Sequence, residues 1–218
     1  MTETTLIVAD DHPLVRTALR EALRRGAPDI GIVECATLDQ VLAAIAERGE
    51  QVDLVLLDLS MPGSQGFIGL FVLLAHHPTV PVAIISASED SATVRRAISY
   101  GAAGFIPKSA AMEEIAAAIE TILGGEVYIP ADAADAPSQA DDSELARRLA
   151  SLSPQQMRVL SMVAEGKLNK QICYEMGVAE QTIKSHVSQI LKKLGVGSRT
   201  QAVILLNRLG VERLEPLG

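Results

Sequence analysis

Acidic side chains follow two apolar runs of the sequence, where they could hold a divalent cation. Asp10 and Asp11 come directly after residues 6–9, and Asp58 follows residues 54–57. Clustered carboxylates repel one another unless a cation lies between them, and Mg²⁺ suits a shallow site with one or two direct carboxylate ligands. A bound Mg²⁺ would also neutralise charge on phosphoryl oxygens, which prepares an aspartate to attack phosphorus and form an acyl phosphate.

Within this acidic set we expect a division of roles. Asp58 is the expected nucleophile, and Asp10 and Asp11 are expected to hold the metal directly or through water. The backbone carbonyl of Ser60 is a further expected metal ligand. Any one of these aspartates alone would more often be a turn or helix-capping residue.

Two more side chains supply what a phosphoryl group would require. Ser86 offers a hydroxyl and Lys108 an ammonium group, each at the end of an apolar run, and both can bond phosphate oxygens. Taken singly, each is an ordinary surface or strand-end residue. Together with the three aspartates they form a set at four expected strand ends, which favours a functional interpretation.

The elements that must position this set are repeated βα units. Residues 5–125 alternate short apolar runs with amphipathic stretches, which is typical of a parallel sheet covered by helices. In a doubly wound sheet the first and third strands flank the switch point at which ligands bind beyond the carboxyl ends of the strands. The three carboxylates are therefore expected to meet in one crevice. Strands are expected at residues 6–9, 32–35, 54–57, 82–86 and 104–106.

The net charge of −8 conceals two unlike halves. Residues 1–144 carry 8 Lys and Arg against 22 Asp and Glu, which gives −14, whereas residues 145–218 carry 11 against 5, which gives +6. Phosphate contacts supply much of the affinity for nucleic acids, so the basic half is expected to bind a polyanion. The pattern predicts three parts: a first domain at 1–128, a linker at 129–147 and a second domain at 148–218.

The basic half has a wholly helical pattern with a helix-turn-helix spacing. Ser153 and Pro154 are initiation signals for one helix, and Gly177 separates two later ones. The second of these later helices is the expected reader of the major groove. Its outward residues Thr182, Lys184, Ser185, Ser188 and Gln189 could contact base edges, bridging waters or, in the case of Lys184, phosphate. The expected contacts to backbone phosphates are Lys170, Lys192, Lys193 and Arg199.

The five residues of the acidic set resemble those of the receiver domains of response regulators. The resemblance covers residues 5 to about 125 and implies a flavodoxin-like α/β fold with a five-stranded parallel sheet in the order 2-1-3-4-5. It also implies that phosphorylation draws in Ser86, and that the aromatic on the last strand, here Phe105, swings inward as a switch.

The segments AEGKLNKQI, GVAEQTIKSHV and LKKLGVGSRTQAV resemble the LuxR/FixJ-type helix-turn-helix module. This resemblance covers residues 152–203 and implies an all-α domain of four helices, the last of which, at about 199–208, often contributes to dimerisation. The whole chain is thus similar to the NarL/FixJ response regulators. Such a protein binds double-stranded DNA as a homodimer after a sensor histidine kinase phosphorylates its aspartate, and RNA polymerase is a candidate partner.

Further expectations concern the activity and the compartment. The protein is expected not to be an enzyme, beyond self-phosphorylation from a phosphodonor and slow autodephosphorylation. No apolar run approaches the ~20 residues of a membrane-spanning helix, so we expect a cytoplasmic protein without a membrane partner. Two alternatives stay open: a receiver-like transcription factor that works without phosphorylation, and a Mg²⁺-dependent phosphohydrolase that uses the same crevice.

Overall fold

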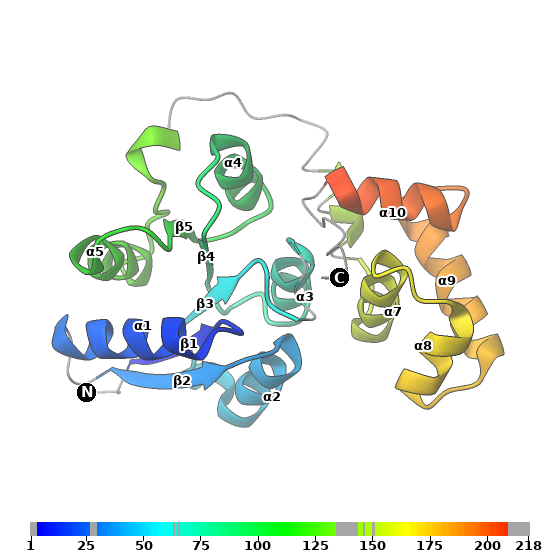
Figure 1. Cartoon of the computed structure of the whole chain (residues 1–218), viewed down its shortest axis with the longest axis horizontal. Coiled ribbons are helices and arrows are strands. Elements are labelled where there is room, and N and C mark those ends of the chain that lie inside the picture. The colour runs from blue at the N-terminus through cyan, green and yellow to red at the C-terminus, as the bar shows by residue number, and fades with distance from the viewer. Residues whose placement is uncertain are drawn as a thin grey trace.

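The computed structural model describes residues 4–26, 30–62, 64, 66–133, 144–145, 147–149 and 151–208. Its first domain contains a five-stranded sheet in the order β2-β1-β3-β4-β5, and all neighbouring strands are parallel. The predicted strand order is confirmed (Figure 1). The strands are β1 (Thr5–Ala9), β2 (Gly31–Cys35), β3 (Leu54–Asp58), β4 (Val82–Ser86) and β5 (Gly104–Pro107).

Helices cover both faces of this sheet because alternate strand residues point to opposite sides. The face that carries Leu6 and Val8 packs on α1 and α5, and the face that carries Ile7 packs on α2, α3 and α4. Each strand is therefore buried on both faces and reads as a continuous apolar run. The helices are α1 (Pro13–Gly26), α2 (Leu38–Arg48), α3 (Ile68–His76), α4 (Ser91–Ser99) and α5 (Met112–Leu123).

The second domain consists of helices and connecting turns, with no strand among its described residues. The Ser153 side chain accepts a hydrogen bond from the backbone N–H of Gln156, and the Gln156 side chain accepts one from the backbone N–H of Ser153, which forms a capping box at the predicted start. Gly177, at φ 65°, takes the left-handed conformation that the turn requires. The helices are α7 (Pro154–Ala164), α8 (Asn169–Met176), α9 (Glu180–Leu194) and α10 (Arg199–Arg208).

The segment between the two domains is described in part. It includes a short 3₁₀ turn, η2 (Ala131–Ala133), which contacts α4 and in which Ala133 is buried. Residues 144–145 and 147–149 are helical. Most of the expected linker, residues 134–143 and 146, lies outside the described residues, as do residues 209–218 of the second domain. The predicted boundaries at 129 and 147 therefore stay predictions.

The two domains pack against each other through α3 and α7 (Figure 1). One buried apolar cluster includes Leu70 and Leu73 of α3 together with Leu160 of α7 and Leu206 of α10. α9 lies on the side of α7 that faces away from the first domain (Figure 1). Among the described residues, no helix has the length and apolar character needed to cross a bilayer.

Candidate functional site

The sheet register brings the first two acidic positions together. Ala9 pairs with Leu57, so Asp10 lies directly beside Asp58 at the carboxyl ends of β1 and β3. Both side chains are buried, with 0% of Asp10 and 1% of Asp58 exposed. Carboxylates this deeply buried need a charged or hydrogen-bonding partner, because water no longer solvates their charge.

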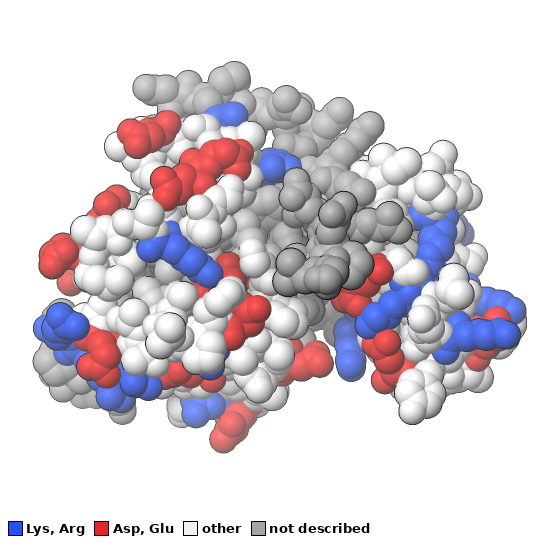
Figure 2. Space-filling view, viewed as in Figure 1, with Lys and Arg blue, Asp and Glu red and all other residues white. Residues whose placement is uncertain are grey.

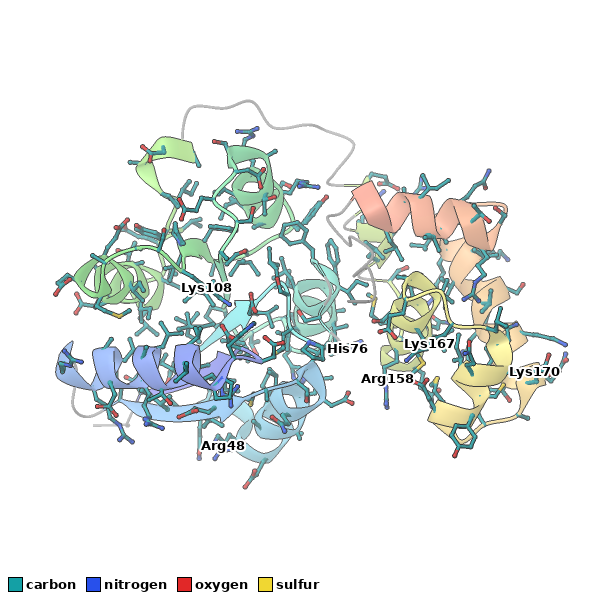
Figure 3. All side chains as sticks on the ribbon, in the orientation of Figure 1. Arg48, His76, Lys108, Arg158, Lys167 and Lys170 are labelled. Atoms are coloured by element: carbon teal, nitrogen blue, oxygen red, sulfur yellow. The ribbon has the colours of Figure 1, made fainter. Side chains whose placement is uncertain are left out.

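Lys108 supplies that partner. Its Nζ lies 2.6 Å from Oδ2 of Asp10 and 3.0 Å from Oδ2 of Asp58. The Lys108 backbone N–H donates to the Ser86 carbonyl at 2.8 Å, which fixes the end of β5 to the end of β4. Figure 3 shows the Lys108 side chain reaching from the end of β5 toward the sheet edge that carries the carboxylates.

Burial acts on both members of the Asp58–Lys108 pair. Desolvation raises the pKa of Asp58 above its usual range, and the hydrogen bond and charge of Lys108 offset only part of this rise. Desolvation alone would lower the pKa of Lys108, but its contacts with Asp10 and Asp58 outweigh it and raise that pKa. The rise at Lys108 reflects the excess of negative charge in the crevice, whereas the rise at Asp58 comes foremost from burial and is increased by the charge of Asp10.

The donor set at this crevice fits a hard divalent cation. Ligand atoms of Asp10, Asp11, His12 and Asp58 all lie within 4.8 Å of one another. Three carboxylates against the single charge of Lys108 leave two negative charges uncompensated, and oxygen ligands of this kind suit Mg²⁺. The cluster could therefore bind a metal ion through its carboxylates.

His12 is closer to this set than the sequence indicated. Its Nδ1 lies 2.7 Å from Oδ1 of Asp11 and 3.2 Å from Oδ1 of Asp10. Its backbone N–H also donates to Asp10 Oδ1 at 2.8 Å, which tightens the turn between β1 and α1. The adjacency of His12 to the acidic pair was the available signal.

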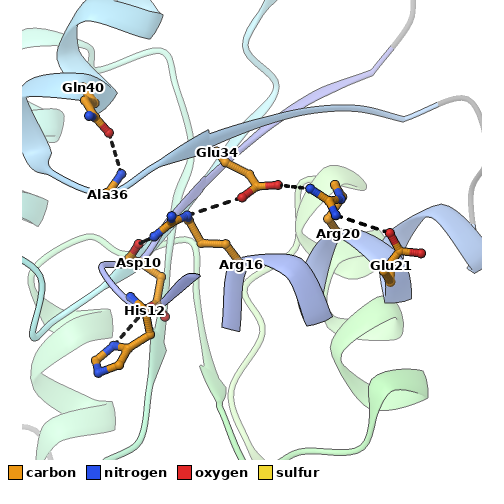
Figure 4. Close-up of polar contacts among 8 residues, drawn as sticks. All are labelled: Asp10, His12, Arg16, Arg20, Glu21, Glu34, Ala36 and Gln40. Carbon is orange, nitrogen blue, oxygen red and sulfur yellow. Dashed lines mark hydrogen bonds and ion pairs between the residues drawn. The ribbon is translucent and has the colours of Figure 1, made fainter. Parts of the chain in front are cut away.

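A network behind Asp10 was not expected from the sequence (Figure 4). Arg16 of α1 donates to the Asp10 carbonyl at 2.5 Å and contacts Glu34 of β2 at 3.4 Å. Glu34 also pairs with Arg20, one helical turn further along α1. These contacts join α1 to the ends of β1 and β2, so they hold the backbone from which Asp10 projects.

The remaining predicted residues of the first domain lie around this crevice. Ser86 is 3% exposed, and its Oγ accepts a hydrogen bond from the Ser88 backbone N–H at 3.1 Å. The Ser60 backbone N–H hydrogen-bonds the Asp58 carboxylate, and the role of the Ser60 carbonyl stays a prediction. Phe105 is fully buried. Its ring therefore already lies inward here, and its role as a switch stays a prediction.

α9 presents two faces of different character. Ile183, Ile190 and Leu194 are buried against the other helices of the domain. The opposite face is exposed, and Figure 2 shows Lys and Arg side chains gathered over the second domain, to which α8 and α9 belong. Exposed residues of this face are Thr182, Lys184, Ser185, Ser188, Gln189 and Lys192.

The lysines expected to contact DNA differ in the partners that they have in the structure. Lys170 and Lys192 are exposed, with no ion-pair partner among the residues described here. Lys184 pairs with Glu180 at 3.0 Å on the same helix. Lys193 instead donates to the Ser151 carbonyl at 2.6 Å.

Two further residues of the predicted DNA-contacting set are bonded inside the domain. Arg199 is half-buried and bonds the Lys167 carbonyl and the Asn169 side chain at the start of α8. The Gln189 side chain, though exposed, accepts a hydrogen bond from Gln156 at 2.8 Å. These contacts tie α9 and α10 to α7 and α8, so both residues contribute to the fold of the domain.

Comparison with known proteins identifies both domains. Residues 6–120 match the family model of the response regulator receiver domain, and residues 150–206 match that of the bacterial regulatory proteins of the luxR family. The chain is a response regulator of the NarL/FixJ type. A response regulator with these two domains is a DNA-binding regulator of transcription, and its family is not one of typical enzymes.

Relatives of this response regulator match along nearly its whole length. The glycerol metabolism activator of Pseudomonas putida is 42% identical over 206 residues, which cover 91% of this chain and 93% of the relative. The nitrate/nitrite response regulator protein NarL of Escherichia coli K12 is 30% identical and covers 94% and 95%. A solved RcsB–DNA complex shares the fold at 22% identity and a TM-score of 0.56, with 94% of this chain and 98% of that chain covered.

Proposed function

We propose that a sensor histidine kinase phosphorylates Asp58 and that the phosphorylated protein binds double-stranded DNA as a homodimer. The observation that carries the proposal is the contact of Lys108 with both buried carboxylates, at 2.6 and 3.0 Å. That geometry places a cation where the oxygens of a phosphoryl group on Asp58 would lie. The receiver and luxR-family matches support the link between this site and DNA.

The residues of the crevice have distinct proposed roles. Asp10, Asp11, Asp58 and the Ser60 carbonyl would hold Mg²⁺, which supplies neutralisation of phosphoryl oxygens when it is bound. After phosphorylation, the Lys108 ammonium group leaves the Asp58 carboxylate and pairs with the new phosphate. The side chains of the crevice act on Asp58 of the same protein and not on a separate substrate. The proposed chemistry is therefore limited to self-phosphorylation from a phosphodonor and slow autodephosphorylation.

A second pair of residues would carry the change away from the crevice. Ser86 donates a hydrogen bond from its hydroxyl to the phosphate, and Phe105 lies on the neighbouring strand β5, where it pairs with Ile84, two residues before Ser86. Because Phe105 already lies inward, the movement we propose here is that of Ser86 and the loop after β4.

Binding to DNA is assigned to α9. Base contacts are proposed for Thr182, Lys184, Ser185 and Ser188, with Gln189 available once it leaves Gln156. Phosphate contacts are proposed foremost for Lys170 and Lys192, whose side chains are exposed. Lys193 and Arg199 are weaker candidates, since they bond neighbouring backbone carbonyls.

Pairing of two copies is the proposed form of control. The outward face of α9 is exposed while α3 and α7 are packed, so phosphorylation need not uncover it. Ile204 of α10 is 52% exposed, which provides an apolar contact for a second copy. A homodimer would then read two half-sites, with RNA polymerase as a candidate further partner and the cytoplasm as the proposed compartment.

The test combines a chemical and a functional measurement. Purified protein is incubated with acetyl phosphate with and without Mg²⁺, and the modified residue is located by mass spectrometry. We expect Mg²⁺-dependent labelling at Asp58 and tighter binding to operator DNA. Asp53→Asn, at an exposed aspartate one strand length away, is the matched control for Asp58→Asn.

Two results would point to other functions. DNA binding of Asp58→Asn that responds to the phosphodonor as the wild type does would favour a factor that works without phosphorylation. Steady turnover of a phosphate ester would favour the phosphohydrolase alternative, which the family matches do not support.

A further inference from the structure

A cavity of about 250 Å³ lies at the junction of the two domains. One wall comes from α2 and α3 of the receiver, through Leu38, Leu42 and Val72. The facing wall comes from α7, through Met157 and Met162. Most of this lining is aliphatic or thioether carbon, and no aromatic residue is among the described residues that line it.

Charged groups of both signs lie at the cavity and form ion pairs. Arg158 of α7 lies 3.7 Å from Asp39 of α2, and Lys167 lies 2.8 Å from Glu165 and 2.7 Å from Glu175. Figure 3 shows Arg158 and Lys167 on the side of the second domain that faces the receiver. An ion that entered would meet its own sign as well as the opposite one, so the cavity favours an uncharged molecule.

Ser161 gives the cavity one polar point. It lines the wall from α7, is 6% exposed, and its Oγ has no hydrogen-bond partner among the described residues. Thr121 in α5 shows the alternative available to a helical hydroxyl, because it donates to the Ala117 carbonyl one turn earlier, at 2.9 Å. A buried hydroxyl without such a bond is costly, and a ligand oxygen at this point would relieve the cost.

We propose that this cavity binds a small uncharged aliphatic amphiphile whose single hydroxyl or carbonyl oxygen bonds Ser161 Oγ. The volume lies just under the ~300 Å³ at which cavities for drug-sized ligands begin, so the ligand is a short chain. Its carbon chain lies between the leucine, valine and methionine side chains of both domains. This site is separate from the acidic crevice and does not rest on the function proposed for that crevice.

The test uses the methionines of the cavity as reporters. The full chain is labelled with ¹³C at its methionine methyls and titrated with 1-hexanol, and the signals are assigned through Met157→Leu and Met162→Leu. We expect saturable shifts at Met157 and Met162. Met112, on the exposed side of α5, is the internal control and should not shift.

Substitutions separate a built site from nonspecific solvent effects. Ser161→Ala removes an unpaired hydroxyl, so the protein should fold as before and bind 1-hexanol about fivefold more weakly, the loss expected for one hydrogen bond. Leu42→Phe fills the cavity from a half-buried position and should abolish the shifts. Methyl signals of buried Met61 report whether the receiver is folded in each variant.

Four outcomes would overturn the proposal. Shifts that rise without saturation, or that persist in Leu42→Phe, would show that 1-hexanol acts elsewhere. Equal binding by the Ser161→Ala protein would remove the hydrogen bond from the site. Binding of hexanoate as tight as that of 1-hexanol would show that the cavity does not select uncharged molecules.

Discussion

At the scale of single residues, the acidic crevice is dominated by one cation that serves two carboxylates. Lys108 contacts Asp10 and Asp58, which are almost wholly buried, so its removal leaves both carboxylates without a contacting lysine. These two carboxylates, those of Asp10 and Asp58, are also candidate ligands of a metal ion. The same lysine therefore stabilises the crevice when no metal ion is bound and competes with a cation that enters it.

Lys108→Met should expose this double role. Breaking a buried ion pair typically costs several kcal/mol, and for this partly exposed lysine we expect the free energy of unfolding to fall by about 3 kcal/mol without Mg²⁺. Because Lys108 no longer competes, Mg²⁺ should bind more tightly than to the wild type. Urea unfolding and Mg²⁺ titration measure the two effects. Lys170→Met, at an exposed lysine, is the control, and equal stability of both variants would contradict the prediction.

Asp58→Asn should change how stability depends on pH. Burial raises the folded-state pKa of Asp58 above its unfolded value, so this group destabilises the fold progressively as the pH rises from the unfolded pKa through the folded pKa. Without Mg²⁺ the variant should melt higher at neutral pH, by about 2–4 °C for each kcal/mol relieved. The difference should shrink as the pH falls toward the unfolded value of about 3.9. Thermal melts across pH check this, and a gain that grows in acid would refute it.

At the scale of elements, α9 carries neighbouring lysines with different surroundings. Lys192 is exposed, whereas Lys193 bonds the Ser151 carbonyl and Gln156 Oε1 at 2.6 and 2.8 Å. Lys193 therefore ties the end of α9 to the start of α7. One position is free to meet a phosphate, and its neighbour holds the helix in place.

Alanine at these two positions should give opposite results. Lys192→Ala should lower the slope of log affinity for DNA against log salt by about 0.9 and leave the melting temperature unchanged. Lys193→Ala should lower the melting temperature, since it removes two hydrogen bonds that hold α9 to Ser151 and to Gln156 of α7, at about 1 kcal/mol each. DNA titrations at several salt concentrations and thermal melts separate them. Equal salt slopes for Lys192→Ala and wild type would contradict the phosphate contact.

The regular elements were largely predictable from the sequence because they rest on local patterns. Five apolar runs became the five strands within one or two residues at each end, and the capping signal at Ser153 marks the start of α7. Convergence of Asp10, Asp58 and Lys108 also followed, since parallel strands end at one edge. The sheet order came from the resemblance to receivers.

Contacts between distant segments were not predictable in the same way. The sequence offered Lys193 and Arg199 as free cations, yet each bonds a carbonyl more than 30 residues away. Long side chains reach whichever acceptor the fold places near them, and no spacing rule reveals that acceptor. The Arg16–Glu34 network and the packing of α3 on α7 depend on tertiary arrangement for the same reason.

At the scale of the whole molecule, the outward face of α9 is exposed while the domains are packed. The proposed control therefore acts on pairing of two copies. Two reading helices in a symmetric dimer contact DNA about one helical turn, ~10 base pairs, apart. The distance between the two half-sites of the operator should then match the distance between the two copies of α9 in the dimer.

Spacing of the half-sites should decide affinity. Inserting five base pairs between them places the second half-site on the opposite side of the duplex, and we expect at least a tenfold loss of binding by the phosphorylated protein. Inserting ten should restore part of it. Gel shifts on the three operators measure the effect, with unphosphorylated protein as the reference. Affinity that is indifferent to spacing would mean that single copies bind.

The shared apolar cluster has a consequence for how the chain denatures. Because Leu70 and Leu73 of the receiver belong to the same buried cluster as Leu160 and Leu206, heat that loosens one domain also exposes carbon surface of the other. Calorimetry should then record one endotherm in which both domains unfold cooperatively. Val72→Asp, which puts a charge into the junction, should split it into two peaks that belong to two independently melting bodies.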